Sequence, residues 1–272
     1  MNKPCLILDL DETVISTLTQ SEINRCMKNN ARDDYDFLKA NLELGDSDKN
    51  KLHKYDWHYD AIPPPPYTHK PTKGSFVTFE RPGLQEFLDF AFENFRVFIW
   101  TAGSPEYAVT LTENIILRRN LDKRKVHGVF NSYHVDLATR VHGPMKDLKL
   151  LWETFNNTLP EGSRCTEYDT IIMDDNPLVH DPYPSNCLYT KALEMDKPRM
   201  AAKDTFLKTI QLQLTALLQM RAGEVKPMET AELLMKSVPN LEGKSLDEVT
   251  KRLDTNRPLS VEVLNFLNGM TD

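Results

Sequence analysis

The chain has 272 residues, of which 40% are hydrophobic, and this content can bury the core of one large domain, alone or with an appendage. Its formal net charge of -7 provides no overall basic field, so the composition does not favour direct binding to nucleic acid or to an anionic membrane. No run approaches the roughly 18 to 20 apolar residues of a membrane span, and no amino-terminal stretch resembles a signal peptide. We therefore expect a soluble intracellular protein, nuclear or cytoplasmic, without a membrane partner.

The four cysteines show neither a Cys-x-x-Cys pair nor a metal-ligand spacing. They are Cys5, Cys26, Cys165 and Cys187. Free thiols in a reducing compartment are the simplest interpretation.

The first predicted element is a buried parallel strand over residues 5 to 8, which are mostly apolar. Two carboxylates, Asp9 and Asp11, follow it at the end of the strand where open α/β sheets place their ligands. On a continuing strand these residues would share a face, and such close like charges repel unless a cation or a shared proton neutralises them. The pattern therefore predicts a metal, although an Asp-x-Asp pair by itself is more often a turn.

Residues 16 to 75 are interpreted as a polar insertion, with weak helical periodicity around Ile23 and Met27. The run from Pro63 to Pro66 must be extended, which is typical of a rigid surface connector; a polyproline ligand for another protein is the alternative. The aromatic residues before this run either cover the core or line a substrate cleft. They are Tyr55, Trp57, His58 and Tyr59.

A short strand is predicted over residues 76 to 79, and an amphipathic helix follows it. The inward side chains of that helix are Leu84, Phe87, Leu88 and Ala91.

A second buried strand is predicted over residues 96 to 100, and Thr101 and Ala102 follow its end. Ser104 can cap a helix that begins with Pro105. A hydroxyl and backbone amides beside a helix amino terminus form a natural phosphate cradle, and the alternative interpretation is an ordinary helix cap.

Two short β-like pieces are predicted at residues 126 to 130 and 134 to 137. Lys146 follows at a predicted helix start, where a cation opposes the helix dipole unless it meets an anion. This placement suggests that Lys146 has an anionic partner rather than a solvated position.

A third buried strand, over residues 168 to 173, ends at Asp174 and Asp175. Two carboxylates at a strand end again suit a hard cation such as magnesium, and a turn in the Asp-Asp-Asn-Pro sequence is the alternative. One further strand is predicted over residues 186 to 189.

The remainder of the chain is predicted to be helical, and it either packs on the sheet or binds a partner through an apolar groove. The expected helices cover about residues 201 to 221, 229 to 236, 245 to 253 and 260 to 268. We divide the chain into a first domain over residues 1 to 197 and a helical extension over residues 198 to 272.

The strand-then-helix repeats predict a Rossmann-like α/β fold, with a parallel sheet flanked by helices and a helical C-terminal extension. In such a sheet the carboxyl ends of the strands meet at one edge, which would bring together Asp9, Thr101 and Asp174.

Four strings resemble, in order, motifs of the haloacid dehalogenase superfamily, in particular its FCP/SCP-like (NLI-interacting factor-like) phosphatases of the RNA polymerase II C-terminal domain. The strings are Asp9-Leu10-Asp11-Glu12-Thr13-Val14, Trp100-Thr101-Ala102, Lys146-Asp147-Leu148 and Asp174-Asp175-Asn176-Pro177. The string Arg81-Pro82-Gly83, followed by Phe87-Leu88, also resembles this branch.

The resemblance implies a magnesium-dependent phosphatase with an aspartyl-phosphate intermediate. In this family pattern, Asp9 attacks phosphorus and Asp11 serves as general acid and base. The phosphoryl group would be bound by Thr101, Ala102 and Lys146. The implied magnesium ligands are Asp9, Asp11, Asp174 and Asp175.

The implied substrate is a phosphoserine or phosphothreonine in an extended, proline-containing protein segment, such as the RNA polymerase II C-terminal domain. A phosphatase of a small molecule or of a nucleic-acid end would use the same motifs, because they act on phosphorus and not on the leaving group. A catalytically silent binding module would lack at least one acidic motif, whereas all are present here. The candidates for docking a proline ring are Tyr55, Trp57, Tyr59, Phe130 and Tyr133.

Overall fold

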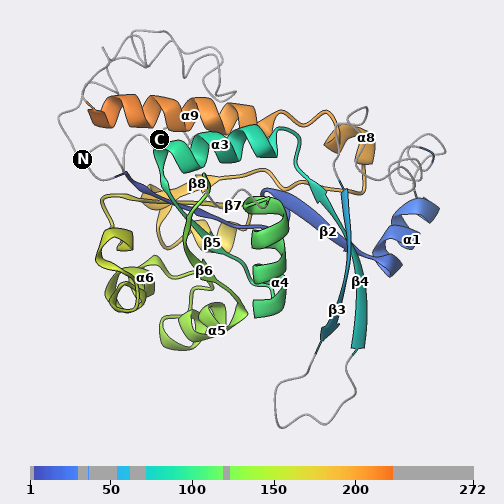
Figure 1. Cartoon of the computed structure of the whole chain (residues 1–272), viewed down its shortest axis with the longest axis horizontal. Coiled ribbons are helices and arrows are strands. Elements are labelled where there is room, and N and C mark those ends of the chain that lie inside the picture. Colours follow the sequence, from blue (N-terminus) through green and yellow to red (C-terminus); the bar gives the residue numbers. More distant parts are fainter. Residues whose placement is uncertain (1–2, 30–35, 37–53, 62–71, 119–122, 223–272) are drawn as a thin grey trace. The chain divides into compact units, whose positions relative to one another are not determined.

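The computed structural model describes residues 3–29, 36, 54–61, 72–118 and 123–222 (Figure 1). The chain divides into two compact units. The first consists of Met1–Asp9, Gln85–Lys191 and Phe206–Asp272, and the second of Leu10–Leu84 and Ala192–Thr205. The domain boundary that the sequence predicts at residue 197 stays a prediction.

A five-stranded parallel sheet forms the centre of the first unit, with strand order β6-β5-β1-β7-β8. The strands are β1 (Cys5–Leu8), β5 (Arg96–Trp100), β6 (Val126–Phe130), β7 (Thr170–Asp174) and β8 (Cys187–Tyr189). Every residue of β1, β5 and β7 is buried, as near-continuous apolar runs predict for strands covered on both faces. The predicted α/β fold is confirmed.

Helices flank this sheet, and Figure 1 shows α3 and α9 on the opposite side from α5 and α6. The helices of the first unit are α3 (Leu84–Asn94), α4 (Pro105–Leu111), α5 (Ser132–Val141), α6 (Leu148–Glu153), α7 (Pro177–His180) and α9 (Phe206–Ala222). Short turns extend or join them: the π-helical η1 (Thr112–Ile116) and the 3-10 turns η2 (Phe155–Asn157), η3 (Glu161–Ser163) and η4 (Pro184–Asn186). On the α5 and α6 side, the core joins Ile7, Phe98 and Ile172 of the sheet to helix residues such as Ala138 and Leu151.

The predicted burial of α3 is confirmed, because its four predicted inward residues are all buried. In the C-terminal part, α9 begins at Phe206 rather than near residue 201, and it buries Ile210, Leu214 and Leu217. The three further helices predicted between residues 229 and 268 lie outside the described residues.

The prediction of a β-like piece at residues 134 to 137 is wrong, since these residues lie within α5. The Asn131 side chain accepts a hydrogen bond from the Tyr133 backbone N–H, and His134 Nδ1 accepts one from the Asn131 backbone N–H. This reciprocal cap starts a helix where the alternating apolar pattern resembled a strand.

A three-stranded antiparallel sheet organises the second unit, in the order β2-β4-β3. Its strands are β2 (Ile15–Thr19), β3 (Lys54–Ala61) and β4 (Thr72–Glu80), and its helices are α1 (Gln20–Asn29) and α8 (Pro198–Ala201). The sequence predicted only residues 76 to 79 as a strand and helical periodicity near Ile23, which α1 contains. The run from Pro63 to Pro66 lies outside the described residues.

Arg81 is fully buried in the second unit, where it joins segments that are far apart in the chain. Its Nη1 donates to the Thr13 backbone oxygen at 2.8 Å, and its Nε and Nη2 donate to the Asp204 carboxylate at 3.1 Å and 2.9 Å. The Arg81 backbone N–H also donates to the Val14 oxygen at 3.0 Å. Arg81 therefore holds the segment that follows the first acidic motif.

The four cysteines are free thiols, as the sequence predicts. Burial is the main cause that raises the pKa of the Cys5 thiol and that of the Cys187 thiol. Among the described residues, no helix combines the length and the apolar content needed to cross a membrane.

Candidate active site

The carboxyl ends of three neighbouring strands carry most of the predicted site residues. In the sheet register, Leu8 of β1 lies level with Ile99 of β5 and with Met173 of β7. The residues that follow or end these strands therefore lie at one edge, as the parallel arrangement predicts. They are Asp9, Thr101 and Asp174.

Three carboxylates converge at this edge. Asp9, Asp174 and Asp175 each offer an oxygen, and these oxygens lie within 4.8 Å of one another. Asp9 and Asp174 are buried, whereas Asp175 is half-buried. Like charges this close repel, so the arrangement needs cationic partners to be stable.

Lys146 supplies one positive charge. Its Nζ lies 2.6 Å from Asp9 Oδ1 and 2.6 Å from Asp174 Oδ2, and the side chain is 5% exposed. Burial by itself would lower the pKa of Lys146, but the charges of Asp9 and Asp174 outweigh it and raise the pKa, so the ammonium form is retained. This meets the sequence-based expectation of an anionic partner for Lys146.

The donor set fits a divalent cation. The three carboxylates contribute -3 and Lys146 contributes +1, which leaves -2 before any ion binds. Hard carboxylate oxygens are the ligands that magnesium prefers, and magnesium usually takes few of them from the protein. Asp9, Asp174 and Asp175 can therefore hold a metal ion.

Backbone and side-chain donors fix Asp174 at the end of β7. Its Oδ1 accepts a hydrogen bond from the Asn176 backbone N–H at 2.9 Å. Its backbone oxygen accepts hydrogen bonds from His180 Nε2 at 2.7 Å and from the Thr190 N–H at 3.0 Å. These contacts leave Asp174 little freedom to turn away from Lys146.

Thr101 is buried directly after β5. Its Oγ1 accepts a hydrogen bond from the Gly103 backbone N–H at 3.0 Å, and its own N–H donates to the Phe130 oxygen at 3.0 Å. Ala102 is exposed, and the Ser104 side chain caps α4 by accepting from the Tyr107 N–H at 3.2 Å. The predicted cap is confirmed, and the exposed turn lies at the same edge as the carboxylates.

Asp11 belongs to the second unit and is not among the three converging carboxylates. β1 ends at Leu8, so Asp9 and Asp11 do not lie on one continuing strand, and Asp11 instead forms an isolated bridge with Ile15. Glu12, which follows it, has a positive φ of 61°. A shared site for Asp9 and Asp11 stays a prediction.

Sequence reasoning missed a buried hydrogen-bond network beside Lys146. Asp147 is fully buried, and its carboxylate accepts hydrogen bonds from the Tyr183 hydroxyl, from His142 Nδ1 and, at 2.9 Å, from the Lys149 backbone N–H. The aspartate before a helix was a usable signal for an N-cap. Tyr183 lies 36 positions away, and no local pattern indicates that contact.

Two of the aromatic residues predicted to dock a proline ring differ in exposure. Phe130 is buried, with its ring centroid 5.1 Å from that of Trp100 and 5.2 Å from that of Phe155, so its predicted role in docking is wrong. Tyr133 is 62% exposed on α5.

Comparison with protein families matches residues 4–223 to the NLI interacting factor-like phosphatases. A CTD phosphatase-like protein 355R of Invertebrate iridescent virus 3 is 28% identical over 220 residues, covering 78% of this chain and 95% of the viral protein. The protein of the same name from Invertebrate iridescent virus 6 is 34% identical over 134 residues, covering 46% of this chain and 70% of that protein.

Solved structures of Fcp1, described as an essential RNA polymerase II CTD phosphatase, also match. One is 17% identical with a TM-score of 0.47 and covers 98% of this chain. A second, of a fission yeast Fcp1 variant bound to beryllium fluoride, is 16% identical with the same TM-score and the same coverage of this chain. This chain spans 61% and 62% of those two chains.

Proposed function

Because this chain belongs to the NLI interacting factor-like phosphatase family, we propose that it hydrolyses phosphomonoesters in a magnesium-dependent reaction. The convergence of Asp9, Asp174 and Asp175 around Lys146 is the observation that carries the proposal. Cations stabilise the negative charge of a phosphate ester, and this cluster combines a buried ammonium group with ligands for a divalent ion.

Asp9 is the proposed nucleophile. Its carboxylate attacks phosphorus and forms an aspartyl-phosphate. The bond between phosphorus and the ester oxygen breaks, and the substrate leaves as an alcohol. The contact with Lys146 supports this role, since a neighbouring cation keeps the carboxylate ionised. The Asp9 backbone N–H donates to the Met173 oxygen at 3.0 Å, which holds the nucleophile at the sheet edge.

Lys146 and Thr101 are proposed to bind the phosphoryl oxygens. Lys146 carries several N–H donors, so it can contact a phosphoryl oxygen as well as its carboxylate partners. The Thr101 oxygen accepts from the Gly103 N–H and can donate its own proton to a phosphoryl oxygen. The exposed backbone at Ala102 can approach the phosphate closely.

Asp11 is the proposed general acid and base, by its match to the family motif. It would protonate the leaving oxygen in the first step and accept a proton from the attacking water in the second. Once it has given up its proton, Asp11 is a carboxylate and can act as the base, and the proton taken from the water restores its starting state.

Magnesium is proposed to be held by Asp9, Asp174 and Asp175, with Asp11 as a further ligand implied by the family pattern. When bound, the ion would neutralise the remaining charge of the cluster and withdraw charge from the phosphoryl oxygens.

The proposed substrate is a protein that carries phosphoserine or phosphothreonine in an extended segment. The names of the viral relatives support this substrate class, because they describe CTD phosphatase-like proteins. The exposed ring of Tyr133, on the helix that follows β6, offers an apolar surface for a neighbouring proline.

The reaction is tested with Asp9→Asn and Asp136→Asn, which make the same chemical change at the proposed nucleophile and at an exposed position of α5. We expect Asp9→Asn to lose turnover while its circular dichroism spectrum stays that of the wild type, and Asp136→Asn to remain active. EDTA should abolish the wild-type activity, and magnesium should restore it. Full activity of Asp9→Asn, or of the wild type in EDTA, would contradict the mechanism.

The substrate class is tested by comparing catalytic efficiencies for phosphopeptides, nucleotides, sugar phosphates and oligonucleotides with a 3′- or 5′-phosphate. We expect a proline-containing phosphoserine peptide to have the highest kcat/KM. A higher value for a free nucleotide or an oligonucleotide end would replace the protein substrate but leave the chemistry in place.

A further inference from the structure

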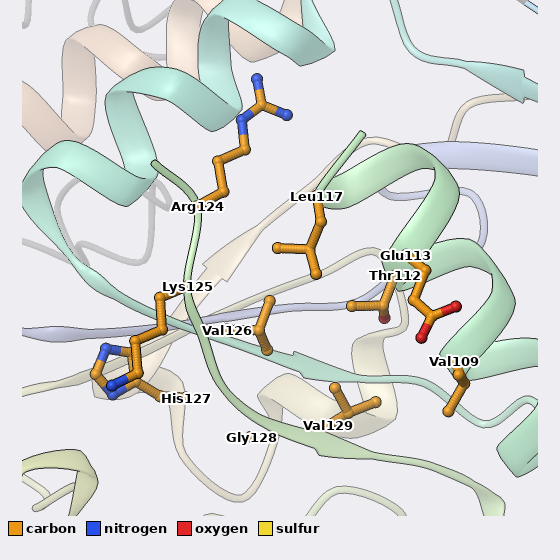
Figure 2. Close-up of a pocket in the computed structure, with 10 residues that line it drawn as sticks. All are labelled: Val109, Thr112, Glu113, Leu117, Arg124, Lys125, Val126, His127, Gly128 and Val129. Atoms are coloured by element: carbon orange, nitrogen blue, oxygen red, sulfur yellow. The ribbon is translucent and has the colours of Figure 1, made fainter. Parts of the chain in front are cut away.

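A pocket of about 550 Å³ lies between β6 and the segment formed by α4 and η1 (Figure 2). Figure 2 shows apolar side chains facing one another across it, with Val126 and Val129 on the strand and Val109 and Leu117 on the helical side. None of these residues belongs to the catalytic cluster.

A β-bulge gives β6 its side of the pocket. Val97 pairs with Val126 and Phe98 pairs with Gly128, so His127 is an extra residue in β6. In a regular strand, residues three positions apart point to opposite faces, but the extra residue brings Val126 and Val129 to the same face. The bulge therefore builds a continuous apolar wall.

A π-helical turn gives the other side, and it buries a hydroxyl group. The Leu117 N–H donates to the Thr112 oxygen at 2.8 Å, five residues back. Thr112 is 4% exposed and lines the pocket, yet its Oγ1 has no hydrogen-bond partner within the described part of the chain. Because this oxygen is buried, it offers a ligand in the pocket no accessible donor or acceptor, and recognition depends on the apolar side chains that line the space.

β6 is also the outer strand of the sheet, next to β5. Its residues Val126–Val129 are half-buried, in contrast to the fully buried strands at the centre. In the described parts of the chain, no strand pairs with its outer edge. Such an edge can accept an extended peptide as an added strand, and adjacent pockets then select its side chains.

We propose that the outer edge of β6 and this pocket bind an extended segment of the phosphoprotein substrate, with an aliphatic side chain in the pocket. This inference rests on the proposed function. β6 leads toward the reacting groups, because the oxygen of Phe130, its last residue, accepts a hydrogen bond from the Thr101 N–H. A strand added along β6 therefore has one end directed toward the edge that carries Asp9.

The sheet geometry sets the distance between the two bound groups. An added strand lies three strand spacings from β1, or about 14 Å, and the three steps from Val97 to Trp100 amount to about 10 Å along the strands. The straight line that combines these two separations, from the pocket end of the added strand to the end of β1, corresponds to about five residues of extended chain. The aliphatic residue should therefore lie about five residues or more from the phosphorylated residue.

The test uses two sets of phosphopeptides and a small aryl phosphate. The short peptides contain the phosphorylated residue and three neighbours on each side. The long peptides contain eight neighbours on each side, and each peptide of this set carries a single leucine at a different position. For the wild type, a leucine at least about five residues away, on one side of the phosphate, should raise kcat/KM about tenfold, as burial of its side chain predicts. N-methylation of the backbone beside that leucine should remove the gain.

Three variants locate the binding site. Thr112→Val removes the unpaired hydroxyl with little change in volume, and Val129→Lys places a charge in the pocket. Leu212→Lys, at an exposed position of α9, is the matched control. Val129→Lys should lose the gain from the distant leucine and keep the wild-type kcat/KM for the aryl phosphate and the short peptides. Thr112→Val exchanges the hydroxyl for a methyl group and should keep the gain, because the leucine side chain makes no hydrogen bond. Leu212→Lys should behave as the wild type throughout.

Equal kcat/KM for long and short peptides in the wild type, or an unchanged leucine gain in Val129→Lys, would overturn the pocket assignment while the phosphoprotein substrate stands. If the wild type hydrolyses the aryl phosphate but no phosphopeptide, both the pocket assignment and the protein substrate fail. Unchanged kcat/KM of Val129→Lys for the aryl phosphate and the short peptides would exclude misfolding as the cause of a lost gain.

Discussion

The Nζ of Lys146 lies 2.6 Å from Oδ1 of Asp9, and this contact joins residues 137 positions apart in the chain. The ammonium group is almost completely removed from solvent, and the second carboxylate that it contacts belongs to Asp174. A single lysine thus partly neutralises carboxylates at the ends of two neighbouring strands. Removal of the lysine would therefore leave buried carboxylates without a cation, in addition to its effect on the proposed chemistry.

Replacement of Lys146 by methionine should destabilise the protein by about 3 kcal/mol, because it leaves buried carboxylates without their cation. Turnover should fall on the order of 100-fold or more, since a donor to the phosphoryl group is lost. Magnesium should raise the midpoint of urea unfolding more in Lys146→Met than in the wild type. An equal magnesium effect on both proteins would show that the ion does not bind beside Lys146.

Replacement of Asp147 by asparagine should destabilise the protein by about 1 to 3 kcal/mol, because Tyr183 and His142 lose a charged acceptor. Asparagine can still cap α6, so the helix should remain. Tyr183→Phe removes one of the donors and should have a smaller effect. Urea unfolding of the two variants measures both effects, and a larger loss in Tyr183→Phe would contradict a central role for the carboxylate.

The stability of the protein should fall as the pH decreases from about 7 to about 5, in part through His134. Burial is the main cause that lowers the pKa of His134 below its ordinary value of 6.5. The unfolded chain therefore binds a proton at a higher pH than the folded chain, and protonation favours unfolding below pH 6.5.

His134→Gln keeps a side-chain acceptor for the Asn131 backbone N–H and removes the titrating group. The difference between the free energies of unfolding at pH 7.5 and pH 5.5 should be smaller in this variant. If the difference is unchanged, His134 does not contribute to the acid sensitivity.

Arg81→Ala should destabilise the protein by about 3 to 5 kcal/mol, because it removes a buried guanidinium group and leaves the Asp204 carboxylate without it. Arg140→Ala, at an exposed position of α5, is the control and should change stability by less than about 0.5 kcal/mol. Thermal or urea unfolding distinguishes the two. Similar stability of both variants would contradict the structural role of Arg81.

The buried strands of the first unit could be predicted because their apolar runs carry the signal locally, from Cys5–Leu8 to Thr170–Asp174. The convergence at the sheet edge then followed from parallel topology. The second sheet could not be predicted in the same way. The sequence of β3 is Lys-Tyr-Asp-Trp-His-Tyr-Asp-Ala, which is not an apolar run, and the strand is recognised only from its pairing with β4. Strand pairing of this kind depends on tertiary context more than on local propensity.

Parts of the site were also hidden from sequence reasoning. The Asp147 network depends on a contact with Tyr183, which lies 36 positions away in the chain. The pocket beside β6 depends on one extra residue in a strand and one wide turn in a helix, and neither irregularity alters the apolar pattern. The structure therefore adds most where contacts join segments that are distant in the chain.

The most direct test of the central claim is to trap the phosphorylated enzyme during a single turnover of a labelled phosphomonoester. Rapid acid quenching followed by borohydride reduction converts an aspartyl-phosphate to homoserine, which mass spectrometry can locate in a peptide digest. The account predicts homoserine at position 9 in the wild type, formed only with magnesium and substrate, and none in Asp9→Asn. Homoserine at another aspartate, or complete turnover without any trapped product at Asp9, would contradict it.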